Sequence, residues 1–161
     1  MLTPGPPTAT PEPRQALAPA ARRLWRLEGL VPAVLALAGA GVLQATVGGT
    51  PALLGWAAAV VTGAVTTVAV PELRWRRWRW EVREHEIDIR RGTVAVTRTL
   101  VPILRVQHVD TKRDLLQQWL GLATVVFHTA AGANEIPALT VAEAGHVRDR
   151  IAELARTADE L

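Results

Sequence analysis

Two long stretches without a charged residue dominate the first half of the chain. One covers residues 29–47, the other covers residues 51–70, and only Gly48-Gly49-Thr50 separates them. A helix rises 1.5 Å per residue, so about twenty apolar residues match a hydrocarbon core roughly 30 Å thick. We therefore predict a transmembrane helical hairpin over residues 22–71, with spans at about 29–47 and 51–70.

Two other interpretations of these stretches have less support. Helices buried in a soluble bundle usually keep a polar stripe, and neither stretch has one. A cleaved signal peptide has a shorter apolar segment, and a second span would not follow it at once.

Basic residues flank both stretches, whereas the turn between them has none. By the positive-inside rule, both termini are then cytoplasmic, and the chain is a multi-pass protein of the plasma membrane. Tryptophans stand at the same two boundaries, as an aromatic belt at the membrane interface would require. The predicted membrane-interface residues are Arg22, Arg23, Trp25, Arg26, Arg74, Trp75, Arg76, Arg77, Trp78 and Arg79.

The amino-terminal residues 1–21 are rich in proline, with five prolines among the first thirteen residues. Such a stretch buries too little apolar surface to offset the entropy of ordering it. We predict a disordered cytoplasmic tail.

Residues 72–158 have the pattern of a small α+β domain, followed by a tail at 159–161. Apolar and polar residues alternate over 78–83 and 87–90, and β-branched residues crowd 93–101, which predicts an antiparallel meander. A strand over 104–111 with a bulge near Gln107-His108, a helical turn over 114–120, and strands over 122–130 and 135–139 follow. Thr140 and Glu143 form a capping box, which predicts a final amphipathic helix.

The chain resembles the membrane-flanked bacterial pleckstrin-homology (PH) domain proteins over roughly residues 22–158. The segments that carry the resemblance are RWRWEV at 77–82, RRG at 90–92, VPILRVQHV at 101–109, LGLA at 120–123, TAAG at 129–132 and EIP at 135–137. The resemblance implies a PH-like barrel or sandwich of about seven antiparallel strands, capped by the carboxyl-terminal helix. It also implies a bacterial membrane-associated binding or assembly module rather than an enzyme.

The residue inventory gives no support to catalysis or to a cofactor. The chain has no cysteine and no serine, and its four histidines are dispersed without metal-ligand spacing. We therefore predict no catalytic, cofactor or metal site. The charges of residues 72–161 nearly balance, so a nucleic-acid partner is not expected either.

Arg105, Gln107 and His108 are the candidate contacts for a ligand or partner. A guanidinium, an amide and an imidazole can bind phosphate, carboxylate or a polar protein surface. The alternative is that these groups hydrogen-bond locally and hold the predicted bulge.

Three functions remain after these exclusions. The first is a non-enzymatic module that mediates protein interaction or assembly at the cytoplasmic face, with a protein partner or a second copy of the chain. The second is a reader of anionic lipid headgroups, because the arginines at 74–79 would attract them. The third is a subunit of a membrane export or resistance complex.

Overall fold

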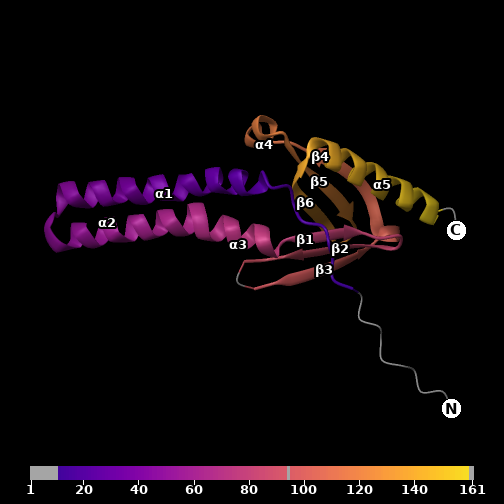
Figure 1. Cartoon of the computed structure of the whole chain (residues 1–161), viewed down its shortest axis with the longest axis horizontal. Helices are drawn as coiled ribbons and strands as arrows, with labels where there is room; N and C mark the ends of the chain where they lie inside the picture. Colours follow the sequence, from indigo (N-terminus) through magenta and orange to yellow (C-terminus); the bar gives the residue numbers. More distant parts are fainter. Residues whose placement is uncertain (1–10, 94, 160–161) are drawn as a thin grey trace, which may run out of the picture.

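The computed structural model describes residues 11–93 and 95–159, in which a long helical hairpin joins a small domain (Figure 1). α1 (Ala21–Thr46) packs against a continuous helix made of α2 (Gly49–Ala64), the π-helical segment η1 (Val65–Ala69) and α3 (Val70–Arg77). Gly48 and Gly49 reverse the chain with φ of 64° and 61°, a conformation that glycine adopts without penalty. Both helices are long and apolar enough to cross a membrane.

Small residues form the seam of the hairpin. Ala33 and Ala40 of α1 and Ala52 and Ala59 of α2 are buried, while leucines and valines cover the outer faces. The closest approach is at Gly29, where an added Cβ would overlap the carbonyl oxygen of Thr66.

Two other glycines do not lie where we expected them. The small residues of the two spans suggest that Gly39 and Gly41 face Gly55 and Gly63 across this seam. An added Cβ at Gly39 or Gly41 would meet nothing among the described residues within 4 Å, whereas one at Gly55 would lie 2.9 Å from Leu43 and one at Gly63 3.7 Å from Ala33. Close packing of the two helices therefore depends on Gly29, Gly55, Gly63 and the alanines.

The domain contains two three-stranded antiparallel sheets. The first has the order β1-β2-β3 and the second the order β4-β5-β6. The elements are β1 (Arg79–Val82), β2 (Glu86–Arg91), β3 (Thr97–Pro102), the 3₁₀ turn η2 (Ile103–Arg105), β4 (Val106–Lys112), α4 (Leu115–Leu120), β5 (Leu122–Thr129), β6 (Gly132–Thr140) and α5 (Val141–Asp159). α5 contacts β4, β5, β6 and η2, so it covers the second sheet.

The prediction of about seven strands in a barrel or sandwich needs correction. The described residues form six strands in two separate sheets, and they do not form a closed barrel. β3 starts only at Thr97, and the next strand starts at Val106 because residues 103–105 form the 3₁₀ turn.

Several local predictions are confirmed. The register between β4 and β5 shifts between Val106 and His108, so Gln107 lies in a bulge. The capping box forms, because the backbone N–H of Glu143 donates to the Thr140 hydroxyl at 3.2 Å and the Thr140 N–H donates to the Glu143 carboxylate at 3.0 Å. α5 extends to Asp159, and residues 160–161 of the predicted tail lie outside the described residues.

The segment 11–18, which we call the strap, contradicts the prediction of a disordered tail. Gln15 and Trp80 exchange backbone hydrogen bonds of 3.1 and 2.9 Å, which adds one residue of pairing to the edge of β1. Leu17 and Ala18 are buried, and the Trp75 indole donates to both of their carbonyls at 3.2 Å. The prediction is therefore wrong for residues 11–21, of which Ala21 already begins α1, while residues 1–10 lie outside the described residues.

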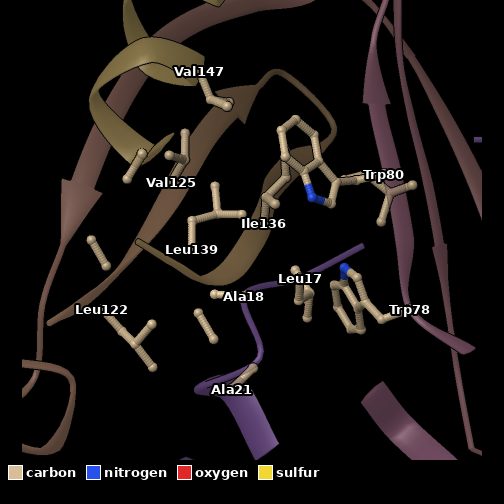
Figure 2. Close-up of a cluster of buried hydrophobic side chains, with 14 of the residues drawn as sticks. Leu17, Ala18, Ala21, Trp78, Trp80, Leu122, Val125, Ile136, Leu139 and Val147 are labelled. Atoms are coloured by element: carbon tan, nitrogen blue, oxygen red, sulfur yellow. The ribbon is translucent and has the colours of Figure 1, made fainter. Parts of the chain in front are cut away.

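The strap enters the core between the two sheets. Figure 2 shows Leu17 and Ala18 between Trp78 and Trp80 on one side and Leu122 and Leu139 on the other. The amino-terminal segment thus supplies apolar side chains that the strands alone do not provide.

The antiparallel order assigns every turn of the domain to one of two ends. β1 starts where α3 stops and runs away from the hairpin, so the chain returns toward the hairpin along β2, along β4 and along β6. The β2–β3 loop, α4 and the start of α5 therefore lie at the proximal end, beside the hairpin. The β1–β2 turn, η2 and the β5–β6 turn lie at the distal end.

Candidate functional site

The junction between the hairpin and the domain gathers most of the basic and aromatic residues that the sequence singled out. α3 ends at Arg77, and Trp78 turns the backbone into the extended conformation that leads to β1. Arg74, Arg76 and Arg77 occupy the last turn of α3, where cations favour the negative end of the helix dipole.

Arginine and tryptophan side chains stack across this junction. The Arg22 guanidinium lies 4.3 Å from the centre of the Trp75 ring, and the Arg74 guanidinium lies 4.3 Å from that of Trp25. Arg74 also lies 6.0 Å from the Trp78 ring centre, and Trp25 and Trp78 are 6.5 Å apart. Cation–π contacts of this kind tie α1 to α3 and to Trp78, the residue that links α3 to β1.

The predicted aromatic belt is therefore wrong for two of its three members. Trp25 and Trp78 are 5% and 4% exposed, so they pack inside the protein rather than in lipid. Trp75 is half-buried and donates to the strap.

Some of the predicted interface arginines bind groups of the protein, and others are exposed to the surroundings. Arg22 and Arg76 pair with Glu72 at 3.6 and 2.8 Å, and Arg79 donates to the Trp78 carbonyl at 2.6 Å. Arg23 and Arg26 are exposed on α1. Arg77 is exposed too and donates to the Thr93 carbonyl in the β2–β3 loop.

A pocket of about 470 Å³ lies between α3 and the β2–β3 loop. Figure 1 shows this loop reaching back beside α3 at the proximal end. The residues that line the pocket are Val70, Arg74, Trp78, Arg91, Gly92, Thr93 and Thr97. Two arginines and two threonines therefore line the pocket together with the apolar residues Val70 and Trp78.

The geometry of this pocket depends on one glycine. Gly92 has φ of 140°, and an added Cβ would overlap the carbonyl oxygen of Ala95. Arg91 and Thr97 are directly paired across β2 and β3, so the tight loop between them keeps both side chains at the pocket.

The arginines of this pocket can take an anion. Within the described residues, neither Arg74 nor Arg91 makes a hydrogen bond or an ion pair with another side chain. A guanidinium presents five N–H donors in a planar fork that matches phosphate or carboxylate oxygens. Sequence reasoning flagged Arg74 alone; the RRG turn at 90–92 was the signal that could have added Arg91.

Arg105, Gln107 and His108 lie away from this pocket. Arg105 ends η2 at the distal end, and all three side chains are exposed. His108 Nε2 lies 2.9 Å from Asp110, whose other oxygen is 3.7 Å from His128 Nε2. The side chains of Arg105 and Gln107 make no hydrogen bond within the described residues, so the bulge does not depend on them.

A buried carboxylate that sequence reasoning missed holds the strap on the first sheet. Asp88 is fully buried on β2, and Arg98 donates to both of its oxygens at 3.1 and 2.6 Å. Arg83 lies 3.3 Å from the same carboxylate, and both arginines donate to the Pro11 carbonyl. The hydrogen bond to Asp88 raises the pKa of Arg98 above its ordinary value. This cluster is structural, because its donors are engaged by the protein itself.

A second hollow, of about 290 Å³, lies between the strap, β1 and α5. Trp80 and Val147 contribute its apolar surface, and Glu143, His146 and Arg150 of α5 contribute polar groups. The buried Nε1 of Trp80 has no hydrogen-bond partner among the described residues.

A comparison with protein-family models matches residues 30–155 to the bacterial PH domain. The chain belongs to the bacterial PH domain family. The UPF0699 transmembrane protein YdbS of Bacillus subtilis (strain 168) is 39% identical over 154 residues, which cover 92% of this chain and 97% of that protein. The UPF0699 transmembrane protein YdbT of the same organism is 27% identical over 88 residues, which cover 52% of this chain and 18% of that protein. No solved structure matches the chain.

Family membership confirms the resemblance that the sequence motifs carried. Together with the two long apolar helices, it identifies a membrane protein with a PH-like domain.

Proposed function

We propose that the chain is a two-span membrane protein with both termini in the cytoplasm. The strap supports an even number of crossings, because Gln15 before the first helix pairs with Trp80 after the second. Arginines flank the hairpin only at the end that joins the domain, which favours a cytoplasmic domain by the positive-inside rule. A reporter fused after the carboxyl terminus should read cytoplasmic and one inserted at Gly49 external; the opposite pattern would reject this topology.

We further propose that the domain is a non-enzymatic module that binds an anionic lipid headgroup at the cytoplasmic face. The observation that carries this proposal is the pocket of Arg74 and Arg91 beside the last turns of α3. In the proposed topology this pocket opens at the level of the headgroups. An apolar wall beside guanidinium groups fits a lipid phosphate whose acyl chains stay in the bilayer.

The test compares two arginines of equal charge. The full-length protein in detergent is titrated with short-chain phosphatidylglycerol and with phosphatidylcholine, and bound lipid is measured by native mass spectrometry. Loss of a charge-assisted hydrogen bond costs about 1.5–3 kcal/mol, so Arg91→Ala should weaken phosphatidylglycerol binding by about tenfold or more.

Arg23→Ala is the matched control, because Arg23 is exposed near the same boundary but outside the pocket. A surface charge contributes about 1 kcal/mol, so this variant should weaken binding by no more than roughly fivefold. Equal losses in the two variants would mean diffuse attraction rather than a pocket.

Protein interaction is the second candidate function, and the hollow between β1 and α5 favours it. Its lining joins the apolar surfaces of Trp80 and Val147 to the polar side chains of Glu143, His146 and Arg150, and such a mixture suits a segment of another protein. A photo-crosslinking residue at His146, inside the hollow, should give a discrete product in membranes. The same residue at Arg148, which is exposed outside the hollow, should not.

A further inference from the structure

The short helix α4 exposes its apolar side chains and buries a polar one, the reverse of a helix on the surface of a soluble protein. Leu115 and Trp119 are 83% and 77% exposed, whereas Gln117 is 8% exposed. Residues 115, 116 and 119 fall within about 100° of one another around a helix, so they share one side. An outward apolar side and an inward amide are expected where the outer surroundings are apolar.

α4 is held firmly in this orientation. The Asp114 carboxylate caps its first turn by accepting from the Gln117 N–H at 2.7 Å, and Gly121 ends it with φ of 68°. The Gln117 amide donates to the Thr124 hydroxyl of β5 at 3.0 Å. The exposed side of α4 is therefore fixed by capping and by a buried hydrogen bond.

The position of α4 supplies the apolar surroundings. It lies at the proximal end of the domain, and it contacts α1 (Figure 1). Asp114 is close enough to Glu28 for their charges to interact, and the charge-free stretch of α1 starts at the next residue, Gly29. α4 thus lies beside the domain end of α1, close to where α1 becomes apolar.

We propose that α4 inserts Leu115, Leu116 and Trp119 into the headgroup region of the bilayer, as a third attachment of the protein to the membrane. Its apolar side continues the exposed apolar surface of α1, where Leu30 and Val31 are 48% and 63% exposed. Tryptophan is enriched at this depth because its ring is apolar and its N–H is polar. Because the domain packs directly against the helices, the insertion would fix the tilt of the whole protein against the bilayer.

This inference rests on the two-span arrangement proposed above, and its experiment separates the two. Because the chain has no cysteine, single cysteines can carry an environment-sensitive fluorophore. The full-length variants Trp119→Cys, Leu104→Cys and Leu53→Cys are labelled and reconstituted in lipid vesicles. Quenching by aqueous iodide and by nitroxide lipids is then measured at each position.

The two reference positions are matched in exposure. Leu104 is 71% exposed on η2 at the distal end, and Leu53 is 68% exposed on α2 within a predicted span. We expect the label at 119 to be quenched by nitroxide near the headgroups and to show several-fold weaker iodide quenching than the label at 104. The label at 53 should respond to nitroxide placed deep in the acyl chains.

Three outcomes would overturn the inference. Strong iodide quenching at 119 with lipid quenching at 53 would leave the spans intact and place α4 in water. Protection at 119 from both quenchers would mean that a protein surface, rather than lipid, covers α4. Iodide quenching at 53 would reject the two-span arrangement itself.

Discussion

Replacing Leu17 by alanine tests the strap most directly. Leu17 is 2% exposed and belongs to the buried cluster that includes Trp78, Trp80 and Leu139. A disordered tail would tolerate the change, whereas a core residue would not.

The expected cost follows from the burial. Leucine-to-alanine changes at buried sites cost about 2–5 kcal/mol, because the lost methyl groups leave a cavity that relaxes only in part. For a chain of this size, 1 kcal/mol corresponds to roughly 2–4 °C in Tm, so Leu17→Ala should lower the Tm by about 4–20 °C.

The assay is thermal unfolding of the full-length protein in detergent, followed by near-ultraviolet circular dichroism. Trp75, Trp78 and Trp80 surround the strap, so their signal reports loss of packing in the domain. Leu104→Ala is the control, because Leu104 is 71% exposed and should cost less than about 0.5 kcal/mol. Equal Tm values for the two variants would refute a core role for the strap.

Three further predictions concern single side chains. Asp88→Asn removes the charge that holds Arg98 and Arg83. Breaking a buried ion pair lowers the free energy of unfolding by about 3–5 kcal/mol. We expect a loss of about 3 kcal/mol here, because the Arg98 side chain is 32% exposed. Thermal unfolding measures this loss, and a Tm within error of the parent would contradict it. Gly29→Ala should destabilise the hairpin by about 1–3 kcal/mol, because the added methyl group would overlap Thr66. Gly39→Ala, with open space around it, should be neutral or stabilising by up to about 1 kcal/mol. A Tm for Gly29→Ala equal to or above that of Gly39→Ala would contradict the described seam. Gly92→Ala should distort the β2–β3 loop and reduce phosphatidylglycerol binding to the level of Arg91→Ala, and unchanged binding would show that the loop does not shape the pocket.

Local signals in the sequence predicted the features that depend on neighbouring residues. The two charge-free stretches gave the hairpin helices, although α1 starts at Ala21 and α3 continues to Arg77. The capping box at Thr140, the bulge at Gln107 and the helix stop at Gly121 all formed as their motifs indicated.

Features that depend on distant partners were missed. The partners of Leu17 in the core belong to strands more than sixty residues away, so its proline-rich surroundings indicated disorder instead. Asp88 alternates with Ile87 and Ile89, which predicts an outward carboxylate. It is buried because Arg98 and the strap cover that side of β2.

The interface tryptophans show a third limit. Their positions in the sequence mark the boundary of the apolar stretches correctly, but a boundary does not say whether lipid or protein surrounds a ring. Trp25 and Trp78 are enclosed because the domain packs directly against the helices.

The strap also bears on the order in which the molecule is completed. Leu17 is synthesised about 120 residues before β6, so at roughly 5–20 residues per second its core partners appear about 6–24 s later. In the two-span arrangement, the inserted hairpin brings the start of α1 beside the end of α3 before the strands exist. Gln15 and Trp80 are 65 positions apart in sequence, but the inserted hairpin already holds the neighbouring helix ends together. Their pairing therefore costs much less loop-closure entropy than it would in a free chain. The bilayer, by holding the hairpin together, thus acts as a template on which the soluble half of the protein folds.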